Sequence, residues 1–89
     1  MKNLTFVGDF NVVVTNEAQF LSDCSIALDP VRCIYVYSGS IIVTLTGEAR
    51  IVEDTITRIH DQGLIMGGYD TLFTIDSDNT SGEMQVNGN

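Results

Sequence analysis

The side chains best suited to contact another molecule are those of Tyr35, Tyr37, Arg58, His60 and Tyr69. The first two alternate along a β-rich run, so one face of a strand would present two rings and two hydroxyls. Arg58 and His60 alternate along a second run, where the pair would hold an anionic ligand. Tyr69 follows a glycine pair whose backbone can approach a ligand closely. We therefore predict a ligand site at these five residues.

Each part of this site also has a structural interpretation. Two tyrosines on one strand face more often pack in a core, with their hydroxyls reaching its rim. Arg58 and His60 equally fit a polar stripe that faces solvent. The glycine pair before Tyr69 also suits a tight turn, which needs the same backbone freedom.

The residue pattern gives little support for a metal site or a catalytic site. Asp76, Asp78 and Thr80 alternate as at the start of a calcium loop, but the next glycine comes one place late and no glutamate closes the spacing. Glu53 and Asp54 are adjacent, so on a strand their carboxylates would point to opposite faces. One histidine cannot form a multi-histidine metal centre, and no Gly-x-Ser-x-Gly motif is present. We expect no enzyme activity, no cofactor and no bound metal.

The two cysteines, Cys24 and Cys33, are too few for a disulfide scaffold and lack the spacing of a zinc site. We expect both to be reduced and buried, where they act as small apolar side chains. No apolar run reaches the length of about 18 residues that a membrane span needs. No signal-peptide core follows the first residues, so we predict a cytoplasmic location.

Charge narrows the choice of partner. Twelve acidic and four basic residues give a formal net charge of −8. This charge opposes binding to phosphate backbones and anionic membranes, so we predict neither direct nucleic-acid binding nor membrane binding. It favours a basic protein surface as the partner. The alternative is that the acidity serves solubility alone.

The most strongly patterned stretch is residues 31–47, two β-rich runs that meet at a Ser-Gly turn. β-branched and aromatic residues favour extended backbone, and glycine lets the chain reverse, so we predict a β-hairpin. In its second strand Ile41, Val43 and Leu45 share one face and should be buried. The first strand is apolar or aromatic on both faces, which predicts a central strand.

The residues before this hairpin favour further short strands. Residues 4–7 and 10–15 flank a Gly-Asp pair and predict a first hairpin. Cap-type and helix-forming residues predict one helical turn near residues 16–21. Residues 25–28 predict a short strand that ends at Asp29-Pro30.

The residues after the hairpin are read in the same way. In residues 55–60 the β-branched side chains favour a strand, although Val52, Ile56 and Ile59 fall at helical spacing. Three more strands are predicted, at residues 64–66, 69–76 and 83–86. Together these elements predict one all-β domain over residues 1–89, a small jelly-roll or sandwich-like barrel of about 7–9 short strands.

The order of features from Ile34 to Asp78 resembles the cupin family. A strand runs into Ser38-Gly39-Ser40, and the features that follow are Gly47, Gly63, Gly67-Gly68 and Ser77-Asp78. The resemblance implies a jelly-roll barrel, often dimeric, with a pocket inside it. Residues 40–46 hold none of the histidines and glutamate of the family's first motif, and Tyr69-Asp70 stand where its second motif has proline and histidine. The resemblance therefore implies no metal site here.

Three functions fit these observations. We expect a non-enzymatic binding protein that looks like the small acidic inhibitors made by phages and docks on a basic host protein. The first alternative is a metal-free, cupin-like pocket protein that holds a small ligand. The second alternative is a virion structural or decoration subunit. An 18% charged fraction in so short a chain also predicts self-association, as a homodimer or a higher oligomer.

Overall fold

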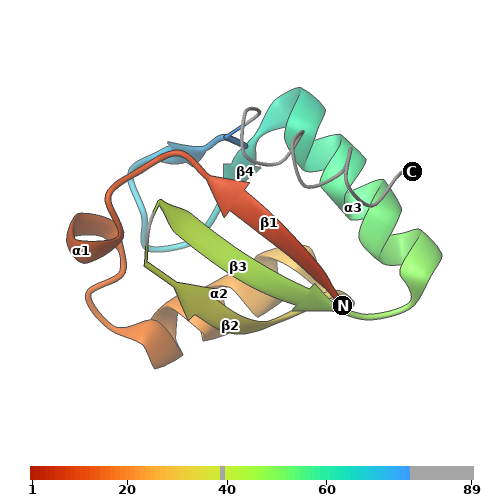
Figure 1. Cartoon of the computed structure of the whole chain (residues 1–89), viewed down its shortest axis with the longest axis horizontal. Coiled ribbons are helices and arrows are strands. Elements are labelled where there is room, and N and C mark those ends of the chain that lie inside the picture. The colour runs from red at the N-terminus through yellow and green to blue at the C-terminus, as the bar shows by residue number, and fades with distance from the viewer. Residues whose placement is uncertain (39, 77–89) are drawn as a thin grey trace.

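A three-stranded antiparallel sheet lies at the centre of the computed structural model, which describes residues 1–38 and 40–76 (Figure 1). Its strands are β1 (Lys2–Phe6), β2 (Arg32–Tyr37) and β3 (Ile41–Thr46), in the order β1-β3-β2. β3 pairs with a neighbour on each side, so it is the central strand and β2 lies at an edge.

The predicted hairpin is confirmed, because β2 and β3 are antiparallel neighbours. Ile41, Val43 and Leu45 are fully buried, as the alternation along the second strand predicted. The predicted central position of the first strand is wrong. β1 occupies the far side of β3 and leaves β2 at the edge, although both faces of β2 are rich in apolar and aromatic residues.

The remaining described elements are three helices and a second, two-stranded sheet. They are α1 (Phe10–Val13), α2 (Glu17–Leu28), α3 (Ala49–Gln62), β4 (Leu64–Ile65) and β5 (Leu72–Phe73). The prediction of an all-β jelly-roll or sandwich-like barrel is therefore wrong, and the described fold is mixed α/β. In Figure 1, α2 passes behind the central sheet and α3 lies to one side of it. None of the described helices is long and apolar enough to cross a membrane.

α2 replaces both the single helical turn and the strand predicted for residues 25–28. The Asn16 side chain accepts a hydrogen bond from the Gln19 N–H (3.0 Å) and caps the helix start. One turn later the Gln19 side chain donates to Asp23 Oδ1 (3.0 Å). The helix continues to its twelfth residue because its apolar side chains recur every four positions on one buried face, at Phe20, Cys24 and Leu28.

α3 shows that helical spacing outweighed β propensity in the second half of the chain. The predicted strand at Thr55–His60 is wrong, and these residues lie inside a 14-residue helix. The helix buries Val52, Thr55 and Ile59 on one face and exposes its charged residues on the other. β-branched residues reduce helix propensity by only a few tenths of a kcal/mol, which burial of such a face readily offsets.

The first predicted hairpin does not form either. Asp9 Oδ1 accepts a hydrogen bond from the Asn11 N–H (3.0 Å), and the short helix α1 begins after this cap instead of a second strand. β1 therefore pairs with β3, with Leu4 opposite Val43. Its other edge is covered by the chain after β5, where the Asp76 N–H donates to the Thr5 carbonyl (2.8 Å).

The strands predicted near the C-terminus are confirmed only in part. β4 covers Leu64–Ile65 of the predicted 64–66 strand. Within residues 69–76 only Leu72–Phe73 form a strand, and Ile75 adds a single bridge to Phe6. The strand predicted at residues 83–86 lies outside the described residues.

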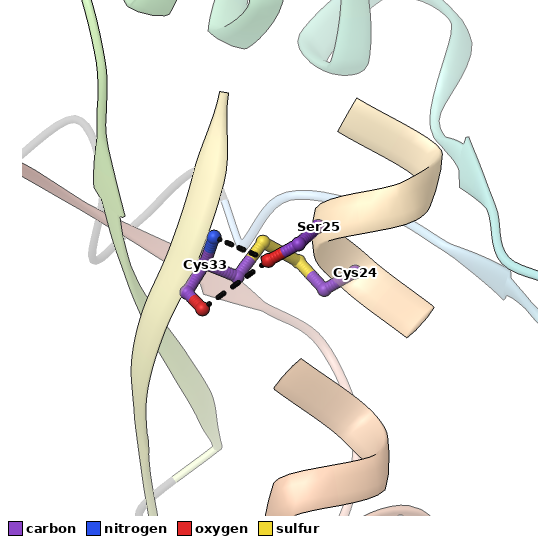
Figure 2. The surroundings of a disulfide bond; sticks show 3 residues. All are labelled: Cys24, Ser25 and Cys33. Carbon is purple, nitrogen blue, oxygen red and sulfur yellow. Dashed lines mark hydrogen bonds between the residues drawn. A yellow bond between two sulfur atoms is a disulfide. The ribbon is translucent and has the colours of Figure 1, made fainter. Parts of the chain in front are cut away.

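A disulfide between Cys24 and Cys33 joins α2 to the edge strand β2 (Figure 2). The prediction that both cysteines are buried is confirmed, but the prediction that they are reduced is wrong. The sequence pattern suggested no pairing because only the fold of α2 against β2 brings the two residues together. Beside the disulfide, Ser25 Oγ accepts from the Cys33 N–H (2.9 Å) and donates to the Cys33 carbonyl (3.4 Å).

The substitution Val43→Ala tests the buried face of β3. We expect it to lower the free energy of unfolding by about 1–3 kcal/mol through lost burial and a residual cavity. Chemical denaturation measures the change. Val12→Ala is the matched control, because Val12 is 71% exposed and its truncation creates no cavity. Equal stability of the two variants would contradict the assigned core face.

The disulfide should contribute to stability by constraining the unfolded chain. For a sequence separation of nine residues we expect the oxidised protein to be about 2–3 kcal/mol more stable than the reduced one. Denaturation with and without a reductant measures this difference, and the Cys24→Ala/Cys33→Ala variant should not respond to the reductant. Detection of two free thiols in the denatured, unreduced protein would show that the bond is absent.

Candidate binding surfaces

Ionisable residues are distributed unevenly over the described fold. The strands of the central sheet contain Lys2 and Arg32 and no carboxylate. By contrast, residues 3–31 and 61–76 contain no lysine, arginine or histidine. The acidic residues of these two stretches are Asp9, Glu17, Asp23, Asp29, Asp61, Asp70 and Asp76. Net negative charge is therefore concentrated on α2, its flanks and the chain from the end of α3 onward.

An acidic surface forms where α2 meets the loop before β5. We define it by Glu17, Asp23 and Asp70, which lie on the two segments that meet at the ring of Tyr69. Glu17 and Asp23 lie three residues before and after Phe20 on α2, and the Tyr69 ring packs edge-on against Phe20 at 5.8 Å between centroids. Asp70 follows Tyr69 directly in the chain and is exposed.

This environment changes the pKa of the Tyr69 hydroxyl. Burial raises the pKa of Tyr69 above its ordinary value of 10.0, and the negative charge of Asp23 raises it further. Both effects disfavour the phenolate. Tyr69 therefore stays a neutral hydrogen-bond donor at physiological pH, near the carboxylate of Asp23.

The Tyr69 ring also has a structural role that the sequence did not indicate. It contacts Phe73 edge-on at 5.6 Å, and Phe20 contacts Phe73 in the same way at 6.0 Å. These three rings fasten α2 to the segment around β5. Only the part of Tyr69 that remains accessible can contact a partner.

Tyr35 and Tyr37 lie together on the outer side of β2. Their rings stack at 6.1 Å between centroids and 30° between planes, and they are 55% and 47% exposed. The structural interpretation, in which these rings pack in the core, is wrong. The register of β2 on β3 shifts between Cys33 and Tyr35, so Cys33 and Val36 face the core while both tyrosines face outward.

The tyrosines belong to a sheet face that we call the tyrosine face. Residues paired directly across antiparallel strands share a face, so the register defines two rows on it. These rows are Thr5, Ile42 and Tyr37, and Asn3, Thr44 and Tyr35. Thr44 Oγ1 donates a hydrogen bond to Asn3 Oδ1 (2.7 Å), which ties the central strand to β1. No carboxylate lies in either row, and α2 packs on the opposite face through Cys33.

A shallow groove of about 790 Å³ runs between α2 and the start of β2. Its lining residues are Leu21, Ser22, Ser25, Ile26, Asp29, Arg32 and Cys33. Ser25 is already hydrogen-bonded to Cys33. The groove contains none of the five predicted site residues. Sequence reasoning missed it because residues 25–28 were predicted to form a strand, which hid the helix face that makes one wall.

Arg58 and His60 are exposed and lie on the helix α3, not on the strand that was predicted for them. Residues two apart on an α-helix point about 200° away from each other. The prediction that this pair shares one face is therefore wrong. His60 Nδ1 lies 3.8 Å from the carboxylate of Asp61, and both side chains are exposed to solvent.

The described structure thus brings together only one pair of the predicted site residues by a direct ring contact, Tyr35 with Tyr37. Tyr69 packs in the aromatic cluster of α2 and β5, and Arg58 and His60 lie on α3. Ligand binding by any of the five stays a prediction.

No group of three metal-ligating side chains occurs among residues 1–38 and 40–76. Glu53 and Asp54 are both exposed on α3. Asp78 and Thr80, the later members of the calcium-like pattern, lie outside the described residues.

Comparison with known proteins found no match to this chain among protein families, curated proteins or solved structures. The cupin resemblance stays a prediction. The jelly-roll barrel that it implied is not the fold that the described residues adopt.

Because Asp23 lies close to Tyr69, its charge should have a measurable effect on the pKa of Tyr69. Asp23→Asn should lower the pKa of Tyr69, because it removes the negative charge and leaves only the effect of burial. Phenolate absorbance during an alkaline titration, in a Tyr35→Phe/Tyr37→Phe background, measures it. Asp54→Asn on α3 serves as the control and should leave the titration unchanged. A Tyr69 pKa that rises or stays constant in Asp23→Asn would contradict the assigned contact.

Proposed function

We propose that this chain is a non-enzymatic binding protein whose acidic surface docks on a basic region of another protein. The observation that carries the proposal is the segregation of charge: Glu17, Asp23 and Asp70 lie in two stretches of chain that contain no basic residue. Acidity needed only for solubility requires no such separation. A surface of one sign, by contrast, attracts a partner of the opposite sign and orients it during encounter.

Tyr69 supplies the second element of such a surface. Tyrosine is enriched among residues that dominate binding energy, because it combines a large ring with a polar hydroxyl. Here the ring is held by Phe20 and Phe73, so little conformational freedom remains to be lost on binding. Its hydroxyl is kept protonated and can donate to a carbonyl of the partner. The carboxylates of the acidic surface are suited to lysine and arginine side chains.

This function corresponds to the inhibitor class expected from the sequence, of the kind that phages direct at host proteins. A cupin-like pocket protein is less well supported, because the barrel that would enclose its pocket does not form. The proposal of a virion decoration subunit is supported by predicted self-association alone. The acidic binding protein is the proposal that uses the observed placement of charge.

The cysteines bear on the compartment in which the protein acts. Disulfides are rare in cytosolic proteins and persist in oxidising compartments. The buried Cys24–Cys33 bond therefore favours an oxidising compartment over the cytoplasm predicted from the sequence. We propose that the basic partner is met there.

The test compares two variants with equal net charge. Glu17→Gln/Asp23→Asn/Asp70→Asn neutralises the acidic surface, and Glu53→Gln/Asp54→Asn/Asp61→Asn neutralises three exposed carboxylates of α3. A basic protein captured from the source cells serves as the partner. We expect the first variant to associate about tenfold more slowly than wild type at low salt, and the second to change little.

Salt provides an independent measurement. At physiological ionic strength, charges are screened over about 8 Å, so the association rate of the wild type should fall. The association rates of the wild type and of the first variant should then differ less than at low salt. If both variants lose the same amount of association, the acidity acts through net charge only and the acidic surface is not the docking site. An association rate that does not depend on salt would remove charge from the mechanism.

A further inference from the structure

The tyrosine face carries features that the acidic docking surface does not use. It lies on the side of the central sheet opposite α2, where Thr5 and Thr44 are buried, Ile42 is partly buried, and the rings of Tyr35 and Tyr37 on the edge strand are about half exposed. Exposed apolar side chains that gather on one sheet face indicate an interaction surface.

The open edge of β2 is a less suitable contact. Ser25 occupies the N–H and the carbonyl of Cys33, and the register shift before Tyr35 interrupts the regular ladder. Both features hinder the addition of another strand to an edge. The surface left for association is the face of the sheet, where the rows of Tyr35 and Tyr37 lie.

The distribution of charge indicates which partner can bind to this face. Two copies of a chain with a net charge of −8 repel each other when their acidic elements approach. The strands of the central sheet hold no carboxylate, and Arg32, in register with Thr46, is the charged residue on the outward side of β2. Contact between two such faces brings no carboxylate opposite another carboxylate. A polyanion such as nucleic acid would still meet the repulsion of the whole chain.

We propose that the chain forms a two-fold symmetric homodimer through the tyrosine face. The two sheets pack face to face, so Tyr35, Tyr37 and Ile42 of each copy are buried against those of the other. Stacked sheets of this kind lie about 10 Å apart, which accommodates interdigitated aromatic rings. The acidic surface at α2 is built from other elements, so each copy keeps its own Glu17, Asp23 and Asp70.

Sedimentation velocity of the oxidised full chain over a concentration series tests the dimer. We expect a mass of twice 9.7 kDa at micromolar concentration. Dimer formation should tighten as salt rises, because salt screens the repulsion between two acidic chains. This trend is opposite to that expected for docking on a basic partner.

Tyr37→Glu locates the interface. It places a carboxylate on each copy within the proposed contact, so we expect the dimer dissociation constant to increase at least tenfold. Ile65→Glu is the matched control, since Ile65 is 77% exposed on β4 and the substitution adds the same charge. It should leave the dissociation constant within about twofold of wild type. Circular dichroism and the thermal midpoint establish that both variants are folded.

Three results would overturn the proposal. They are a monomer mass throughout the concentration series, a dimer that Tyr37→Glu leaves intact, and an equal loss of dimer in Ile65→Glu. The acidic surface is unchanged in Tyr37→Glu, so binding of a basic partner by this variant separates failure of the dimer from failure of the proposed function.

Discussion

Burial of one face of β3 is the constraint on which the rest of the structure depends. Ile41, Val43 and Leu45 are fully enclosed, and this is achieved because β1 and β2 flank the strand while helices cover the buried side. The same strand directs Ile42 and Thr44 to the opposite side, where they meet the tyrosines of β2. One alternating strand thus defines both the core and the tyrosine face.

The contact of α2 with β2 gives the fold its second organising feature. The Cys24–Cys33 disulfide and the paired hydrogen bonds of Ser25 hold the helix against the edge of the sheet. From this position the same helix supports the aromatic cluster through Phe20 and carries carboxylates on its exposed side. Core packing and surface charge are therefore coupled through one helix, and the acidic surface is held on a rigid element.

The two candidate surfaces differ in physical character. Charge dominates the acidic surface, which acts at a distance and weakens with salt. The tyrosine face is uncharged along its two main rows and acts only at contact, where burial of aromatic area supplies the free energy. Because they lie on different elements, a single small chain can associate with a copy of itself and still present its carboxylates to another protein.

Several properties were determined by the sequence alone: the hairpin of β2 and β3, the buried side of β3 and the net charge. Each is local or additive, since a period of two needs only neighbouring residues and charge is a sum. Tertiary structure decided the rest. Residues 55–60 became helical because Val52 and Ile59 meet the core on one face, a gain that local β propensity does not include. The pairing of Cys24 with Cys33, the outward turn of Tyr35 and the approach of Asp23 to Tyr69 all depend on contacts between separate elements, which no local pattern encodes.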